Sequence, residues 1–231
     1  MGDIPLMNFI FVGSTIMTAN IATVGSHQPT YNGATDGFIC KLNPLGLREW
    51  SSYYGGNKND QLNSVTVDNF NNIYACGASN SPVGISTSNS HQTNYTPDPN
   101  STSSFGPADG IVIKFSPTGD RIWATYYGGE KVDNFSNCYI SNDNYLYLTG
   151  ISQSLSNIST VGSYQENSNG NGDSMIIKFN LNGQRIWGTY IGGENSDVFN
   201  SIGDLKDNFL YLVGRTDSQT NISTTGTFID T

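Results

Sequence analysis

Asp109-Gly110-Ile111-Val112-Ile113-Lys114-Phe115-Ser116 is the stretch of sequence on which the fold depends, because it returns twice elsewhere in the chain. Its counterparts begin at Asp36 and Asp173, and the lysines of the three copies are 73 and 64 residues apart. A glycine, a tryptophan and a glycine pair follow every copy at the same two spacings: Gly46, Gly119 and Gly183; Trp50, Trp123 and Trp187; Gly55-Gly56, Gly128-Gly129 and Gly192-Gly193. So many markers in phase indicate an internal repeat of 64 residues, with nine extra residues in the middle copy.

Each repeat is expected to contain four short strands. The expected first strands are 62–68, 135–141 and 199–204; the second are 8–13, 73–77, 145–150 and 209–214; the third are 36–43, 109–116 and 173–180; and the fourth carry the tryptophans. Turns rich in Asn, Asp and Gly separate the first strand from the second, as antiparallel hairpins require. In the third strand, alternation predicts one fully buried face and one partly buried face. No segment has a helical period, so the class is all-β.

Four strands per unit, repeated in tandem, are typical of a β-propeller of four-stranded antiparallel blades. One such sheet has two apolar faces and cannot bury either of them alone, whereas radial stacking of sheets buries both. The tryptophan and tyrosines of the fourth strand are then expected to fill the space between blades, and the glycine pair permits a sharp turn into the next blade.

The whole chain, 1–231, is interpreted as a single β-propeller repeat domain. Its repeat units run over about 8–59, 60–132 and 133–196, with a partial unit at 197–231. This order gives thirteen strands, which is three repeats plus an extra second strand. We therefore expect a partial ring or one completed by an oligomer, in which a free sheet edge pairs with another chain or with more of a longer chain.

Composition limits the partners and the location. The chain has 10 Lys and Arg against 19 Asp and Glu, a net charge of −9, which disfavours nucleic acid and anionic membranes as partners. No apolar run is long enough to span a membrane, so no membrane insertion is expected, and the first residues lack the pattern of a leader. Only 13% of the residues are charged, and a surface rich in Asn, Ser, Thr and Gly favours an extracellular or cell-surface location.

The repeated pattern resembles the bacterial SBBP β-propeller repeat. The resemblance rests on the Asp-Gly-led third strand with its lysine, on the Trp-x-x-Tyr-Tyr-Gly-Gly run at Trp50 and Trp123, and on Asn72-Ile73-Tyr74 followed by Gly77. It extends over 8–231. The resemblance implies a propeller within a large secreted or surface protein, often attached to adhesion-type domains. It transfers no catalytic residue.

The three cysteines, Cys40, Cys76 and Cys138, are expected to be small core residues. Each occupies a position where the other copies have an aliphatic residue or a threonine, and an odd number excludes a complete disulfide framework. Buried free thiols are therefore the prediction, with a single disulfide as the alternative.

Other residues of chemical interest also follow the repeat. The repeated aspartates are Asp36, Asp109 and Asp173, with Asp60, Asp133 and Asp197. They have oxygens suited to Ca²⁺, but no loop gathers several of them, so turn capping or pairing with Lys41, Lys114 and Lys178 is favoured. His27 and His91 correspond to Tyr164, which indicates an aromatic packing position. No catalytic residue, cofactor site or metal site is predicted.

The extra residues of the middle copy mark the candidate binding site. They fall within 80–108, and loops that interrupt a repeat often carry specificity. Tyr95, Asp98 and Phe105 are the candidate ligand-binding residues.

The expected function is that of a non-enzymatic module, acting as a scaffold or in adhesion by binding a glycan or protein ligand. The alternative is a carbohydrate-active propeller enzyme with carboxylates at the mouth of the central channel. Nothing in the sequence singles out a pair among Glu49, Glu130, Glu166 and Glu194.

Overall fold

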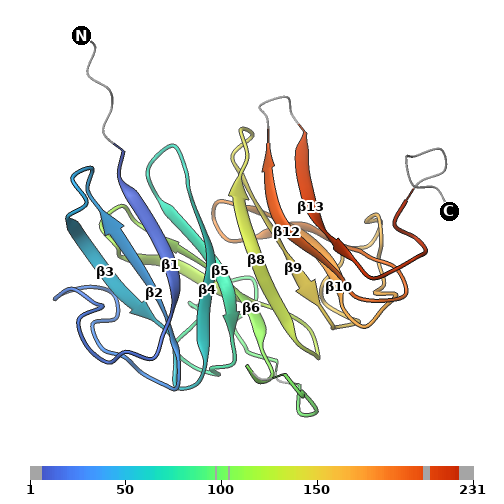
Figure 1. The fold of residues 1–231 in the computed structure, drawn as a ribbon, viewed down its shortest axis with the longest axis horizontal. Coiled ribbons are helices and arrows are strands. Elements are labelled where there is room, and N and C mark those ends of the chain that lie inside the picture. The colour runs from blue at the N-terminus through green and yellow to red at the C-terminus, as the bar shows by residue number, and fades with distance from the viewer. Residues whose placement is uncertain (1–6, 97, 104, 205–208, 224–231) are drawn as a thin grey trace, which may run out of the picture.

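A computed structural model describes residues 7–96, 98–103, 105–204 and 209–223, which form thirteen β-strands (Figure 1). The strands are β1 Phe9–Thr15, β2 Asp36–Leu42, β3 Arg48–Tyr54, β4 Asp60–Val67, β5 Ile73–Ser79, β6 Asp109–Phe115, β7 Arg121–Tyr127, β8 Asp133–Ile140, β9 Tyr145–Ser152, β10 Asp173–Asn180, β11 Arg185–Ile191, β12 Asp197–Asp204 and β13 Leu210–Thr216. These described residues contain no helix, and hence none that could cross a membrane.

The strands form four antiparallel sheets, which we call blades 1 to 4. Blade 1 is β1-β2-β3, blade 2 is β4-β5-β6-β7, blade 3 is β8-β9-β10-β11 and blade 4 is β12-β13. Blades 2 and 3 have four strands in chain order, as the repeat predicts. The all-β class and the four-stranded antiparallel blade are thereby confirmed.

The blades stack side by side in an open arc. The first strands of successive blades lie against each other, β4 against β8 and β8 against β12 (Figure 1). Blades 1 and 4 lie at opposite ends of the arc, and among the described residues no strand of one pairs with a strand of the other. The expected partial ring is therefore observed, with β1 and β13 both in the position of a second strand. The ends of the expected domain, 1–6 and 224–231, lie outside the described residues.

The first strand of each repeat has a bulge opposite a glycine of the second strand. In blade 3 the register between β8 and β9 shifts between Phe135 and Asn137, next to the pairing of Phe135 with Gly150. A Cβ on Gly150 would stand 1.9 Å from the carbonyl oxygen of Asn134. Because the obstacle is backbone, it cannot be relieved by a side-chain rotation.

We expect Gly150→Ala to lower the free energy of unfolding by about 1–3 kcal/mol, since the added methyl group overpacks the bulge. Gly203→Ala in β12 is the control, because a Cβ at Gly203 meets nothing within 4 Å. That variant is expected to be as stable as the parent protein or slightly more so. Urea denaturation followed by circular dichroism measures both, and equal effects would contradict the bulge argument.

The core consists of the two interfaces between consecutive blades. One buried cluster, which includes Ile39, Ile111 and Phe115, joins blades 1 and 2, and another, which includes Val112 and Phe179, joins blades 2 and 3. Strand β6 therefore contributes to both clusters. The expectation that one of its faces is only partly buried was wrong, apart from Lys114, because a middle blade is covered on both sides.

The three cysteines are buried, as predicted. All three are buried free thiols. Cys76 of blade 2 and Cys138 of blade 3 belong to the same cluster, where they pack among tyrosine, leucine and isoleucine side chains.

Candidate functional site

Two buried aspartates flank a glycine at the corner between consecutive blades. In the corner after blade 2, Asp109 Oδ1 and Asp133 Oδ2 lie 2.9 and 2.7 Å from the point where a Cβ on Gly128 would stand. Asp133 accepts hydrogen bonds from Gly129 N–H and from two serine hydroxyls. Asp109 Oδ2 accepts bonds from the side chain of Gln92 and from Thr96, whereas Oδ1 has no hydrogen-bond partner among the described residues.

The corners after blades 1 and 3 repeat this arrangement with Asp36 and Asp60 and with Asp173 and Asp197. Desolvation by burial raises the pKa of Asp109 to about 7 and that of Asp36 to about 6. The turn-capping role predicted for these residues is confirmed. Each corner contains two of these aspartates. The described residues contain no group of three or more His, Cys, Asp or Glu side chains that could hold a metal.

The predicted pairing of these aspartates with the repeated lysines was wrong. Lys41 forms an ion pair with Glu49 at 3.0 Å, and Lys178 forms one with Asp143 at 3.2 Å. Lys114 Nζ lies 5.0 Å from the ring centre of Tyr74. The reason is distance along the strand, because five residues of extended chain place each lysine about 17 Å from the aspartate that begins its strand.

The two histidines are packing residues, as predicted. His27 stacks on Tyr54 with ring centroids 5.8 Å apart, and His91 stacks on Tyr127 at 5.5 Å. Desolvation, with a smaller effect of the neighbouring arginine, lowers the pKa of each histidine to about 4. Both rings are therefore neutral at physiological pH.

The nine extra residues of the middle copy can be placed from the hydrogen bonds of the corners. Thr96 N–H and Asn32 N–H both donate to the aspartate of the third strand. Ala108 and Thr35 carbonyls both accept from the aspartate N–H of the next first strand. The insertion is therefore 97–105.

Tyr95 lies outside this insertion and has Tyr31 as its counterpart. Its hydroxyl donates to the Pro107 carbonyl at 2.6 Å, and its ring packs 6.0 Å from that of Tyr126. Tyr31 closes its own linker in the same way, by donating to Ala34.

Asp98 and Phe105 both belong to the insertion, at its two ends. The carbonyl oxygen of Phe105 accepts bonds from Asn59 and Asn80. Asp98 lines a polar surface pocket of about 390 Å³ together with Lys131 and Gln153. Of the three candidates, Asp98 thus lines a pocket, and the ligand-binding role of all three stays a prediction.

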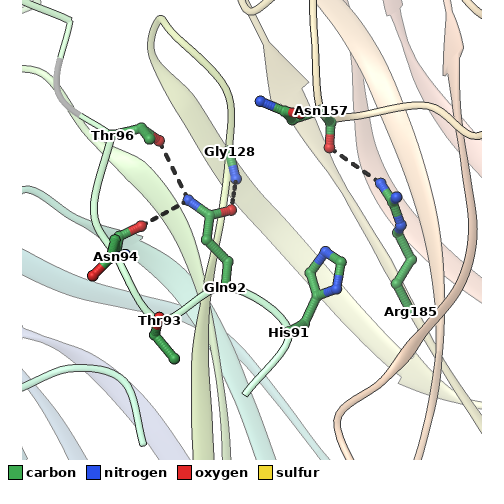
Figure 2. A pocket seen from close by; sticks show the side chains of 8 residues that line it. All are labelled: His91, Gln92, Thr93, Asn94, Thr96, Gly128, Asn157 and Arg185. Atoms are coloured by element: carbon green, nitrogen blue, oxygen red, sulfur yellow. Dashed lines mark hydrogen bonds between the residues drawn. The ribbon is translucent and has the colours of Figure 1, made fainter. Parts of the chain in front are cut away.

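A larger polar cleft, of about 400 Å³, lies between blades 2 and 3 (Figure 2). Its lining residues come from the linkers after β5 and β9, from the corner of blade 2 and from the start of β11: His91, Gln92, Thr93, Asn94, Thr96, Gly128, Asn157 and Arg185. Sequence reasoning missed this cleft because its walls come from two different repeats.

Two of the lining side chains are held by the protein itself. Gln92 Nε2 donates to the Asn94 carbonyl at 3.0 Å, and its Oε1 accepts from Gly128 N–H at 3.0 Å. Arg185 donates to the carbonyl oxygen of Asn157 at 3.1 Å (Figure 2). These bonds hold the side chains of Gln92 and Arg185 in place on the two walls.

The amide side chains of Asn94 and Asn157 are exposed and have no hydrogen-bond partner within the described ranges. They approach the cleft from the linkers of different blades (Figure 2). The backbone at Asn157 has a φ of 66°, and its counterparts Asn20, Gly84 and Asn221 also have positive φ. Asparagine is tolerated there because its short polar side chain suits the left-handed region.

The glutamates that the sequence left unpaired have local structural contacts. Glu130 accepts bonds from Leu155 N–H and the Ser156 hydroxyl, and Glu194 holds the linker after β13 in the same way. Glu166 accepts a bond from Gly162 N–H. No carboxylate side chain is among the residues that line the cleft.

Consecutive four-stranded blades, with polar clefts between their linkers, define the chain as a β-propeller repeat scaffold. Residues 49–82 match the family model described as SBBP, beta-propeller repeat, which confirms the predicted resemblance for this segment. The matched segment runs from β3 through the first corner and β4 to the residues after β5. No curated protein matches the chain.

Proposed function

We propose that this protein is a non-enzymatic ligand-binding module and that the cleft between blades 2 and 3 takes a neutral glycan. The observation that carries the proposal is the pair of unpartnered amides, Asn94 and Asn157, on opposite walls of a polar cleft. Each amide offers both a donor and an acceptor, which is what the hydroxyl groups of a sugar require. A volume of about 400 Å³ falls in the range of small-molecule sites and is suited to one or two sugar rings.

Binding is favoured over catalysis by the chemistry of the lining. A glycoside hydrolase of the usual kind needs two carboxyl groups about 5–10 Å apart across the scissile bond. The cleft is lined by amides, hydroxyls, an imidazole and a guanidinium. Glu49, Glu130 and Glu166 are each engaged in an ion pair or a loop.

A neutral ligand is favoured over an anionic one by charge. The chain carries a net charge of −9, which opposes the approach of an anion. Arg185, the cation of the cleft, already donates to the carbonyl oxygens of Asn157 and Ile158. A location outside the cell or at its surface is part of the same proposal and is supported by the low content of charged residues, 13%.

The proposal is tested with a glycan array followed by calorimetric titration of the sugar that binds. Asn94→Ala and Asn157→Gly are each expected to weaken binding about tenfold, because one hydrogen bond is worth about 1.4 kcal/mol. Glycine is chosen at Asn157 because it keeps the positive φ of 66°. Thr30→Ala, at the position in blade 1 that corresponds to Asn94, is the control and is expected to bind as the parent protein does. Absence of binding to any sugar, or full binding by both cleft variants, would refute the proposal.

A further inference from the structure

The tryptophans of blades 1 and 2 contact the next blade in the same way. Trp50 Nε1 donates to the carbonyl oxygen of Pro117 at 3.1 Å, and Trp123 Nε1 donates to that of Leu181 at 3.2 Å. Both acceptors belong to the turn between the third and fourth strands of the following blade. The glycine of that turn lies on the indole, since a Cβ on Gly119 would be 2.9 Å from the Trp50 ring. Gly183 lies on Trp123 at the same distance.

In blades 1 and 2, a lysine and a histidine also contact this hairpin of the following blade. Lys41 Nζ donates to the Pro117 carbonyl, and Lys114 Nζ donates to that of Leu181, both at 3.2 Å. The histidine of each linker packs edge-on against a phenylalanine of the next third strand, as His91 does on Phe179 at 5.6 Å. A hairpin of third and fourth strands is thus recognised by an indole, a lysine and an aromatic ring.

Among the described residues, no such hairpin covers the corresponding groups of blade 3. Trp187 Nε1 has no hydrogen-bond partner in the part of the chain that the structure describes, and its ring contacts Tyr147 of its own blade. Lys178 turns to Asp143, also in its own blade. Tyr164, which takes the place of the histidine, is 77% exposed.

A cavity of about 300 Å³ lies between blade 3 and the two strands of blade 4. Ile191, Phe199 and Ile222 are among its lining residues. At the complete interface between blades 2 and 3, Tyr127 stands where blade 3 has Ile191, and its hydroxyl reaches the Ile158 carbonyl at 2.5 Å. Phe179 of the third strand packs 5.9 Å from that ring. The cavity therefore lies at the position that, between blades 2 and 3, is filled by a tyrosine of the fourth strand and a phenylalanine of the next third strand.

We propose that Trp187, Tyr164, this cavity and the outer edge of β13 form a docking surface for a hairpin of third and fourth strands from a further repeat of the same kind. The first strand of the hairpin pairs with β13 and places its phenylalanine against Tyr164. The glycine of its turn lies on Trp187 and the preceding carbonyl accepts the indole N–H. We call this surface the Trp187 socket.

The geometry favours such a hairpin over a second copy of this chain. The turn between β2 and β3 of blade 1 is not covered at its glycine, because a Cβ on Gly46 would have no atom within 4 Å. However, blade 1 also carries β1, which occupies the position of a second strand and is paired with β2 along its whole length. Since β13 already fills that position next to blade 3, the incoming element fits only without a second strand of its own.

The test uses a labelled, backbone-cyclised peptide of residues 109–127, which spans β6 and β7 and is shown by NMR to form the hairpin. Fluorescence anisotropy is expected to show saturable binding to the protein, weakened at least tenfold by Trp187→Phe. The matched control is Trp50→Phe, because Trp50 is already covered by Gly119 and its loss is expected to leave binding unchanged. A Gly119→Ala peptide is also expected to bind at least tenfold more weakly, as its φ of 91° and its contact distance both require glycine.

A folded peptide that does not bind, or that binds the Trp187 variant equally well, would overturn the proposal. Equal binding of the Gly119→Ala peptide would show unspecific pairing with a sheet edge, with the same consequence. Sedimentation of the protein alone provides the remaining test. Self-association that rises with concentration and is lost in Trp187→Phe would assign the socket to a second copy and refute the choice of occupant.

Discussion

Replacing Phe135 by alanine is expected to lower the free energy of unfolding by about 3–5 kcal/mol, the cost of removing a large side chain from a packed core. Phe135 is 0% exposed and lies on β8, where its ring is 5.5 Å from that of Tyr127 in the preceding blade. The same ring covers Gly110, on which a Cβ would approach it to 2.8 Å. One substitution therefore opens a cavity between two blades.

The position of the cavity adds a second expected result. In a repeat protein each unit contacts only its neighbours, so weakening one interface can uncouple the parts on its two sides. We expect the unfolding curve of Phe135→Ala to separate into two steps. The parent protein is expected to unfold in a single step. Tryptophan fluorescence and circular dichroism, followed together in urea, distinguish the steps.

Phe70→Ala is the control for this experiment. Phe70 lies in the turn between β4 and β5 and is 78% exposed, so its loss is expected to change stability by less than about 0.5 kcal/mol. If the two variants lost the same stability, the interface between blades 2 and 3 would not be the main source of cohesion.

The strand order could be predicted from the sequence because one physical requirement is repeated three times. Alternating apolar residues, turn residues with positive φ and a glycine pair occur at fixed spacings, so each copy confirms the interpretation of the others. The first strands nevertheless begin two residues earlier than predicted. Asp60 pairs with Ser79 through its backbone while its carboxylate caps the corner, and a polar residue of this kind is easily mistaken for part of a turn.

The candidate site was harder to predict because it depends on contacts between repeats. Asn94 and Asn157 are 63 residues apart and meet at one cleft only because blades 2 and 3 stack. A signal was present at Asn157, which stands at a repeat position occupied by asparagine or glycine with positive φ. The limits of the insertion also could not be found from the sequence. Tyr95 belongs to the repeat and not to the insertion, and the hydrogen bonds of Tyr95 and Thr96 are what show this.

The aspartate corners predict an unusual dependence of stability on pH. Burial raises the pKa of Asp109 to about 7 and those of Asp36 and Asp133 to about 6, against about 3.9 for an aspartate in an unfolded chain. A raised pKa means that the folded protein binds the proton more tightly than the unfolded chain. The stability that this proton contributes is complete below about pH 4 and is lost as the pH rises to about 7. For Asp109 alone we expect a loss of about 2–4 kcal/mol between pH 4 and pH 8.

Asp109→Asn removes this loss without removing the contacts of the corner. The amide oxygen can still accept from Gln92 and Thr96, and the amide N–H₂ takes the place of Oδ1, which faces Asp133. We expect the variant to be about 1–3 kcal/mol more stable than the parent protein at pH 8, with little difference at pH 4. The exposed Asp217→Asn is the control and should leave the pH profile unchanged. Urea denaturation at a series of pH values measures the effect. The test is the difference between the variant and the parent protein, because His27 and His91, whose pKa values are lowered to about 4, make both proteins more stable as the pH rises from 4 to about 6.5. If this difference were the same at pH 4 and pH 8, Asp109 would not hold a proton in the folded protein.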